Sequence, residues 1–402
     1  MAQASPEELL REGTARHARG DLEGAARRYR QVLAQRPRDG NALNLLGVVA
    51  RQQGDLARAL DLAAQAVAAR PDSPIFLVNQ GAALAEAGRL AEAARALRSA
   101  LAHRPDDPVA LRNLGQVLTT AGDPRAALTP LRRAVALAPA APEPWLALAH
   151  ALREAGEANE AVAAARRLLA IAGVAPALAA QARFLLAALG ADAAPDRAPA
   201  AYVRELFDQY ATRFDEDLQS SLGYRTPALL AALIEAAGIP PDGSRRVLDL
   251  GCGTGLSGVA LRPFASRLVG LDLAPRMLAE AQKRGIYDAL AEADLLDWLP
   301  QQSAAFDLVA AADVLNYLGD LTPALAAIRG ALVPGGIAAF SIEAGAGVPF
   351  VLGEGMRYRH DPVHVAQLAH GAELVELARR DAVLREEKSV PVAGVLFVLR
   401  RN

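Results

Sequence analysis

The pattern of hydrophobic and polar positions divides the chain near residue 190. Before that point the pattern predicts helices only. After residue 245, short apolar runs typical of buried strands alternate with helical stretches, the first of them at Arg246–Leu250, Arg267–Leu273 and Ala289–Ala293. Two final β-like runs, Glu373–Leu384 and Val392–Leu399, form the C-terminal end. We therefore expect an all-helical part followed by an α/β sheet that is parallel at first and ends in an antiparallel hairpin.

The helical part repeats itself every 34 residues. The repeated positions are Gly13, Gly47, Gly81 and Gly115; Gly20, Gly54, Gly88, Gly122 and Gly156; Ala25, Ala59, Ala93, Ala127 and Ala161; and Pro37, Pro71, Pro105 and Pro139. Glycine at the turn ends one helix, small residues let two helices approach closely, and proline ends the unit. Each unit is therefore expected to be a helix–turn–helix, and stacked units share one continuous core.

This spacing resembles the tetratricopeptide repeat, with about five copies over residues 6–173 and a capping helix at Val174–Leu189. The resemblance implies a concave groove that binds a peptide or protein partner. A packing or dimerisation scaffold without a separate partner is the alternative. Three asparagines, Asn44, Asn79 and Asn113, suit either a clamp on a peptide backbone or hydrogen bonds within the stack.

A short segment separates the two parts. Residues 191–201 have no hydrophobic period and contain Pro195 and Pro199, which is typical of a linker. The next aromatic residues have nearly helical spacing: Tyr202, Phe207, Tyr210 and Phe214. This segment either packs onto the following domain or forms a lid over a bound ligand. The expected domains are the repeats with their cap at 1–190, the linker at 191–201, and an α/β domain with N-terminal lid helices at 202–402.

The first strand runs into a turn that has glycine at three alternate positions. Asp249 lies near the end of the strand, and Gly251, Gly253 and Gly255 follow it. Strand, glycine turn and helix together are typical of a site for a nucleotide cofactor. The stretch Gly253–Gly258 also fits the dinucleotide fingerprint, which keeps NAD open as the ligand.

Asp249 favours a different cofactor. We expect its carboxylate at the mouth of the turn, where it would repel a pyrophosphate and attract an ammonium or sulfonium cation. The fingerprint also requires its first glycine directly after the strand. The first glycine of the matching stretch is Gly253, whereas the strand here ends at Gly251. Two further acids end the next strands. Asp272 suits the hydroxyls of a ribose, and Asp294 suits an adenine amino group.

The order of these motifs resembles the class I S-adenosylmethionine-dependent methyltransferases over about residues 203–402. The resemblance rests on Asp249–Gly255, Gly270–Asp272, Ala293–Leu295, Phe306–Val309 and Val333–Gly336. It implies a seven-stranded Rossmann-like sheet with its last strand inserted antiparallel, and S-adenosyl-L-methionine as the cofactor. The implied cofactor-binding residues are Asp249, Gly251 and Gly253 at the methionine end, with Gly255 in the same turn, Asp272 and Leu273 at the ribose, Asp294 and Leu295 at the adenine, and Ala312 beside the methyl group.

Methyl transfer is an in-line displacement with a neutral leaving group, so positioning supplies most of the rate and no catalytic triad is expected. A base is needed only where the nucleophile must lose a proton. The candidates for this role are Asp313, Tyr317 and His360, with Glu343 and His364 as further ones. The segment Arg357–Asp361 is expected to be a loop after the fifth strand, either solvated or with arginines that suit an anionic acceptor.

Composition narrows the function further. The net charge of −2 gives no basic field that would attract nucleic acid. The single cysteine, Cys252, excludes a disulfide framework and a thiolate metal site, and we expect no metal. No apolar run is long enough for membrane insertion and no secretory signal is evident, so we expect a cytoplasmic protein.

The sequence therefore predicts an S-adenosylmethionine-dependent methyltransferase whose repeats recruit a protein or peptide partner or a substrate. The methyl acceptor stays unknown at this point. Two other functions remain open: an NAD(P)-dependent oxidoreductase, and a non-catalytic adaptor that binds the cofactor without turnover.

Overall fold

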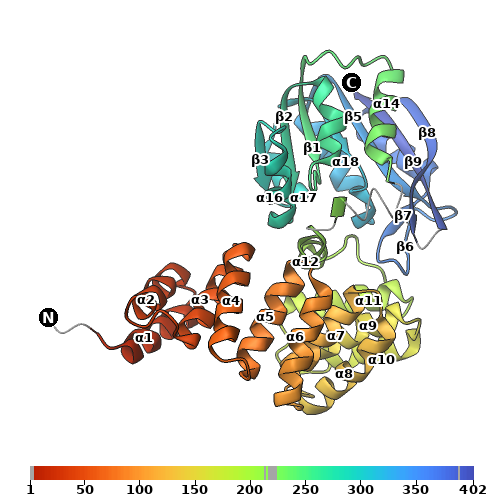
Figure 1. Ribbon diagram of the computed structural model, residues 1–402. Coiled ribbons are helices and arrows are strands. Elements are labelled where there is room, and N and C mark those ends of the chain that lie inside the picture. The colour runs from red at the N-terminus through yellow and green to blue at the C-terminus, as the bar shows by residue number, and fades with distance from the viewer. Residues whose placement is uncertain (1–3, 212–213, 216–223, 388–389) are drawn as a thin grey trace. The chain divides into compact units, whose positions relative to one another are not determined.

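The computed structural model describes residues 4–211, 214–215, 224–387 and 390–402. The chain divides into two compact units, Met1–Ala182 and Arg183–Asn402 (Figure 1). The second unit begins inside a helix, before the boundary that we expected at residue 190. None of the described helices is long and apolar enough to span a membrane.

The first unit is built from helix pairs, as the 34-residue period predicts (Figure 1). Its helices are α1 (Pro6–Ala18), α2 (Leu22–Gln35), α3 (Gly40–Gln52), α4 (Leu56–Ala69), α5 (Pro74–Glu86), α6 (Leu90–His103), α7 (Pro108–Thr120), α8 (Pro124–Leu137), α9 (Pro142–Glu154), α10 (Ala158–Leu169) and the first part of α11 (Pro176–Ala188). The turn glycine of each pair has positive φ, 80° at Gly54 for example, which favours glycine. Where Gly81 lies, an added Cβ would come within 2.7 Å of Leu97 Cγ, so the absence of a side chain lets α5 and α6 approach.

The second unit holds one mixed sheet. Its strands are β1 (Arg245–Leu250), β2 (Ala265–Asp272), β3 (Ala289–Glu292), β4 (Phe306–Ala311), β5 (Leu332–Ala344), β6 (Phe350–Leu352), β7 (Tyr358–His360), β8 (Leu374–Glu387) and β9 (Val390–Arg401). The order β3-β2-β1-β4-β5 is parallel, and β9 pairs antiparallel with both β5 and β8. The expected antiparallel insertion of the last strand is therefore confirmed.

One part of the sheet differs from the expectation of seven strands. The short strands β6 and β7 form an antiparallel pair, and β7 also lies parallel to the end of β5, with Glu343 beside Arg359. The segment Arg357–Asp361, expected to be a loop, thus contains a strand. This strand was not predicted because three residues are too few to give a periodic signal.

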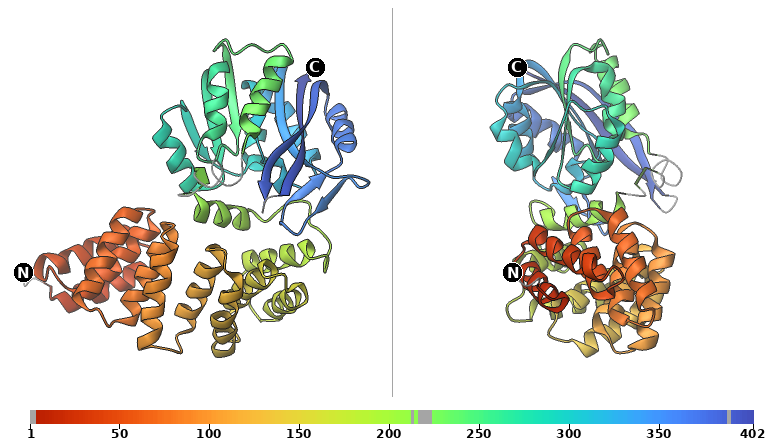
Figure 2. Two further views of the ribbon diagram at one scale, coloured as in Figure 1. Left: turned by 45° about the vertical axis from the view of Figure 1, so that its right-hand side comes forward. Right: turned by 60° about the vertical axis from the view of Figure 1, so that its left-hand side comes forward.

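Helices cover both faces of the sheet (Figure 2). The described helices of this unit are the end of α11, α12 (Ala200–Tyr210), α14 (Thr226–Ala236), α15 (Leu256–Leu261), α16 (Pro275–Arg284), α17 (Leu295–Trp298), α18 (Thr322–Ala331) and α19 (Pro362–Gly371), with 3-10 turns at Arg262–Phe264, Leu299–Gln301 and Leu315–Tyr317. On one face α18 and α19 pack on β4, β5 and β9, and on the other α14 and α15 pack on the same strands. The sheet is thus buried on both faces, and a ligand can reach it mainly at the carboxyl ends of its parallel strands.

Candidate active site

The glycine turn after β1 has the backbone geometry that only glycine adopts readily. Gly251, Gly253 and Gly255 have φ of 60°, 53° and 94°, and α15 begins at the next residue. A Cβ at Gly251 would lie 2.5 Å from Val314 Cγ2, so this glycine is required for packing as well. The predicted strand–turn–helix is confirmed, and its backbone can approach a ligand closely.

Asp249 is fully buried, so its side chain does not lie at the mouth of the turn as we expected. Ser257 Oγ and Tyr287 Oη both donate to its Oδ2, at 2.7 and 2.6 Å. Its Oδ1 has no hydrogen-bond partner among the described residues. Burial outweighs these two hydrogen bonds and raises the pKa of Asp249 to about 7. A cation placed beside this carboxyl would favour its ionised form.

The acids at the ends of β2 and β3 lie on the same side of the sheet as the glycine turn, at the carboxyl ends of the parallel strands. Asp272 accepts hydrogen bonds from the N–H groups of Gly253, at 2.9 Å, and Ala274, at 2.8 Å. Burial raises the pKa of Asp272, and these N–H groups oppose that rise. Asp294 caps α17 through Leu296 N–H, at 2.9 Å. Because β1, β2 and β3 are parallel neighbours, Asp249, Asp272 and Asp294 all lie toward the carboxyl ends of these strands.

Two aromatic residues of the predicted lid lie close to the glycine turn. A Cβ added at Gly253 would be 3.8 Å from the ring of Phe214. The ring of Phe207 packs edge-on against Phe214 and against Tyr317, with centroids 6.1 and 5.5 Å apart. Asp215 accepts hydrogen bonds from Thr254 Oγ1 and from Arg284. This arrangement favours a lid over the turn; residues 212–213 and 216–223 of that segment lie outside the described part.

Asp313 follows β4 at the point where the chain order of the sheet reverses. Its φ is 57°, an unfavourable value for a residue with a side chain, and such strain is often found at functional sites. Its N–H donates to Ser341 Oγ, at 2.8 Å, and its carboxylate accepts from Thr226 Oγ1, at 3.3 Å. Burial raises the pKa of Asp313 more than the charge of Arg385 lowers it. Ala312, the residue before it, is buried.

A family model described as a methyltransferase domain matches residues 248–340, which include the glycine turn and the ends of β2, β3 and β4. Models of the tetratricopeptide repeat match residues 10–74 and 73–140. The chain contains a methyltransferase domain and tetratricopeptide repeats.

Curated relatives match parts of the methyltransferase domain. Methyltransferase-like protein 27 of Homo sapiens is 38% identical over 86 residues, 21% of this chain and 35% of that protein. Malonyl-[acyl-carrier protein] O-methyltransferase of Enterobacter lignolyticus is 34% identical over 113 residues, 28% of this chain and 45% of that protein. Trans-aconitate 2-methyltransferase of Escherichia coli is 42% identical over 59 residues, 14% of this chain and 23% of that protein. The chain thus spans less than half of the length of these relatives.

Solved structures resemble each part of the chain separately. A tetratricopeptide-repeat protein of Thermus thermophilus is 24% identical with a TM-score of 0.40, covering 44% of this chain and 97% of that one. An S-adenosylmethionine-dependent methyltransferase of Mesorhizobium loti is 22% identical with a TM-score of 0.35, covering 42% of this chain and 95% of that one.

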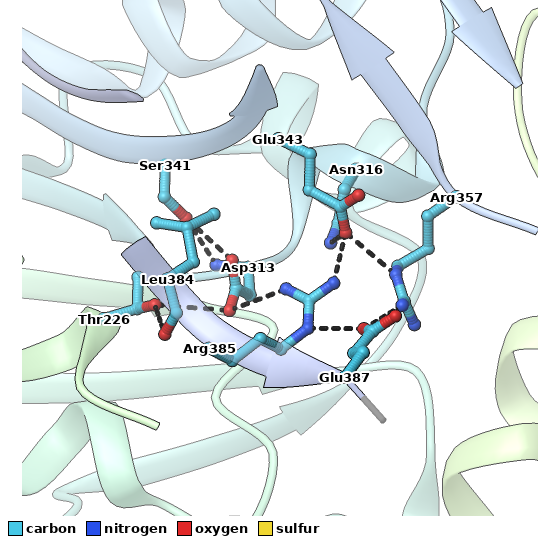
Figure 3. Close-up of polar contacts among 9 residues, drawn as sticks. All are labelled: Thr226, Asp313, Asn316, Ser341, Glu343, Arg357, Leu384, Arg385 and Glu387. Atoms are coloured by element: carbon cyan, nitrogen blue, oxygen red, sulfur yellow. Dashed lines mark hydrogen bonds and ion pairs between the residues drawn. The ribbon is translucent and has the colours of Figure 1, made fainter. Parts of the chain in front are cut away.

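Asp313 belongs to a group of charged residues, most of them buried, in the methyltransferase domain (Figure 3). We call it the switch-point cluster: Asp313, Glu343, Arg357, Arg385 and Glu387. Arg385 pairs with Asp313 at 3.3 Å, with Glu387 at 2.7 Å and with Glu343. Arg357 pairs with Glu343 at 2.8 Å and with Glu387. Strand β8 brings Arg385 and Glu387 to the ends of β4 and β5, and the sequence alone did not indicate this contact.

The three candidate bases of the methyltransferase domain differ in their surroundings. Asp313 lies in the switch-point cluster. Tyr317 lies beside it, with a hydrogen bond to Arg357 and a pKa that burial raises. His360 is buried on β7, where its Nε2 lies 2.9 Å from Leu318 O and 3.1 Å from Gly319 O. Burial lowers the pKa of His360, and its contacts hold the loop after Tyr317. Its role as a base therefore stays a prediction with little support from geometry.

Tyr224 is a further candidate that the sequence did not reveal. Burial and the charge of Asp313 raise the pKa of its hydroxyl, and the charge of Asp249 acts in the same direction. Tyr224 therefore lies near both Asp249, toward the end of β1, and Asp313, just after the neighbouring strand β4. A single tyrosine between a glycine and an arginine carries no motif, so only the fold could bring it to attention.

The linker of the methyltransferase domain is ordered against the loop that carries Tyr317. Ala198 N–H donates to Tyr317 O, at 2.8 Å, and Gly319 N–H donates to Asp196 O, at 2.7 Å. Arg197 pairs with Asp294 at 3.2 Å. Part of the predicted linker thus has its backbone groups paired, with a β-bridge between Arg197 and Leu318.

The recurring asparagines of the repeats have partners inside the first unit. Asn79 Nδ2 donates to Asn44 Oδ1, at 2.9 Å, and Asn113 Oδ1 accepts from the side chain of Arg112. For Asn44 and Asn79 this supports hydrogen bonding within the stack over a clamp on a peptide.

Replacing Asp249 by asparagine is expected to flatten the pH dependence of the stability of the methyltransferase domain. The folded pKa of about 7 exceeds the ordinary value of 3.8, so folding favours the protonated acid. This contribution is complete below pH ~4 and is lost as the pH rises through about 7. Thermal unfolding from pH 4 to 8 should give wild-type and Asp249→Asn slopes that differ by up to ~1.4 kcal/mol per pH unit. Equal slopes would contradict the raised pKa.

Proposed function

We propose that this chain transfers a methyl group from S-adenosyl-L-methionine to an acceptor bound beside Asp313. The observation that carries the proposal is the match to a methyltransferase domain across the glycine turn, whose backbone geometry is intact. The same match weakens the support for an NAD(P)-dependent oxidoreductase.

The residues around the turn fit the parts of this cofactor. The unpartnered Oδ1 of buried Asp249 suits the neighbourhood of an ammonium or sulfonium cation, with Gly251, Gly253 and Gly255 as the close backbone. Asp272 and Leu273 are proposed for the ribose. Asp294 and Leu295 are proposed for the adenine, with Arg197 as the present partner of Asp294.

When bound, S-adenosyl-L-methionine supplies an electrophilic methyl group on a sulfonium whose leaving group is a neutral thioether. The chain itself then has to orient the acceptor and exclude water. Asp313 and Tyr224 lie where an acceptor can be hydrogen-bonded after β4, and Ala312 leaves room beside them. Phe207 and Phe214 are the aromatic side chains proposed to exclude water.

The repeats are proposed to recruit a protein or peptide partner, which is either the methyl acceptor or its carrier. The support is the match to tetratricopeptide models over residues 10–74 and 73–140. The scaffold alternative gains some weight from the Asn79–Asn44 hydrogen bond, which uses two candidate groove residues inside the stack.

Two measurements on the whole chain test the proposed function. Calorimetry should show that S-adenosylhomocysteine binds and that NADH does not. Binding of NADH instead would contradict the cofactor assignment. Incubation with tritiated S-adenosylmethionine and fractionated lysate should label a product, whose size separates a protein acceptor from a small molecule. Cofactor binding without any labelled product would favour the adaptor.

A further inference from the structure

The two arginines of the switch-point cluster are each paired with more than one carboxylate of this chain. Arg385 uses Nε, Nη1 and Nη2 for Glu387, Asp313 and Glu343. Arg357 uses Nε for Glu343 and Nη2 for Glu387, and it is also hydrogen-bonded with Tyr317. An anionic acceptor would have to use the remaining N–H groups of these arginines, where the neighbouring carboxylates repel it. The earlier interpretation that Arg357 suits an anionic group is therefore not favoured.

The carboxylates of the cluster, by contrast, can still accept hydrogen bonds from a ligand. Three of them face two arginines, so the fully ionised cluster carries one net negative charge. Every hydrogen bond between Glu343 or Glu387 and the described residues uses Oε1, so none of these bonds engages either Oε2. The Glu387 side chain is 36% exposed and the Glu343 side chain 8%, so the cluster runs from an accessible carboxylate to a buried one. Such a group attracts hydrogen-bond donors and cations.

Aromatic side chains border the cluster. Tyr317 is packed against Phe207 and hydrogen-bonded to Arg357, and Tyr224 lies near Asp313. Tyrosine hydroxyls are neutral near pH 7, and burial raises the pKa of both above the ordinary value of 10.0. Neutral aromatic rings next to carboxylates are a common setting for ammonium groups.

We propose that the switch-point cluster binds the methyl acceptor and that this acceptor is a primary or secondary alkyl amine. The inference rests on the proposed function. It sets this chain apart from relatives that are named for O-methylation of malonyl-[acyl-carrier protein] and for methylation of trans-aconitate.

The amine arrives as an ammonium ion and must lose a proton before it reacts. Asp313 takes this proton; its side-chain contacts are long, 3.2 Å to Ser341 Oγ and 3.3 Å to Thr226 Oγ1 and Arg385. The free nitrogen lone pair then forms a bond to the methyl carbon as the carbon–sulfur bond breaks and its electron pair stays on sulfur. The product is a methylated ammonium ion. Asp313 then holds the proton, so the cluster regains its excess negative charge only when Asp313 releases that proton to water.

Calorimetry on the full chain tests this assignment with putrescine as the amine probe and succinate as its dicarboxylate counterpart, each with and without S-adenosylhomocysteine. Putrescine should bind and succinate should not. Glu343→Gln should weaken putrescine binding at least about tenfold, since a charge-assisted hydrogen bond is lost. Glu376→Gln is the matched control, because Glu376 lies on β8 outside the cluster and pairs only with Arg379 among the described residues; its affinity for putrescine should be unchanged.

Should Glu343→Gln fail to fold, Glu387→Gln at the exposed end of the cluster replaces it, with the same expected loss. Binding of succinate in place of putrescine, or of neither probe, overturns the amine assignment, as does putrescine binding that neither variant weakens. Failure of S-adenosylhomocysteine to bind overturns the proposed function instead, and the titrations without it still decide on the amine.

Discussion

Replacing Asp272 by alanine is expected to weaken the binding of S-adenosylhomocysteine about a hundredfold. The proposed function gives the carboxylate of Asp272 to the ribose hydroxyls. The same carboxylate also accepts the N–H of Gly253 at 2.9 Å and so holds the glycine turn against β2. Hydrogen bonds to a charged group contribute ~1.5–3 kcal/mol each, and ~2.7 kcal/mol corresponds to a hundredfold change in affinity.

Asp288→Ala is the matched control for this variant. Asp288 lies toward the other end of β2, where its carboxylate also accepts a backbone N–H, that of Leu268 at 2.7 Å. Its removal should lower stability by about as much as that of Asp272 and leave the affinity within about twofold. Calorimetry at equal fractions of folded protein separates the two effects. If Asp272→Ala binds as tightly as the control, the ribose assignment is wrong.

The glycine turn and the acids of this site were predictable because their signal is local. Each of these residues, Asp249, the three glycines and Asp272, lies within a few residues of the end of a strand. Parallel strands bring their carboxyl ends together. The burial of Asp249 was not predictable, because it depends on Tyr287, which comes from a different segment and donates to it at 2.6 Å. The local sequence pattern thus placed Asp249 at the correct turn but wrongly predicted that its carboxylate would be exposed there.

The switch-point cluster could not be predicted in the same way. Asp313 follows β4 and Glu343 lies near the end of β5. Arg385 and Glu387 lie at the end of β8, which reaches the first two residues only through its pairing with β9. Charges in a strand at the end of a chain are usually solvated, so the sequence gives no reason to expect them inside. The docking of residues 195–198 on the loop of Tyr317 is likewise set by backbone hydrogen bonds, which leave no trace in side-chain patterns.

Replacing Arg385 by methionine is expected to destabilise the methyltransferase domain by ~3–5 kcal/mol, because buried carboxylates lose their partner. Burial alone would raise the pKa of Glu343, but the charges of Arg385 and Arg357 outweigh it and the pKa is lowered. A lowered pKa stabilises the folded chain above the ordinary value of 4.5 and ceases to do so as the pH falls. The destabilisation by Arg385→Met should therefore be largest near pH 7 and shrink as the pH falls through about 4.5.

Neutralising the acids together with the arginine separates lost charge pairing from lost packing. If pairing dominates, adding Asp313→Asn and Glu343→Gln to Arg385→Met should restore a large part of the stability at pH 7, since uncharged groups are less costly to bury. Urea unfolding is suitable, with the transition of the methyltransferase domain identified as the one that S-adenosylhomocysteine shifts. A triple variant as unstable as Arg385→Met would mean that the long side chain of Arg385 acts mainly by filling space between β8 and β5. In that event the cluster would be a packing device, and its excess of carboxylates would say little about the acceptor.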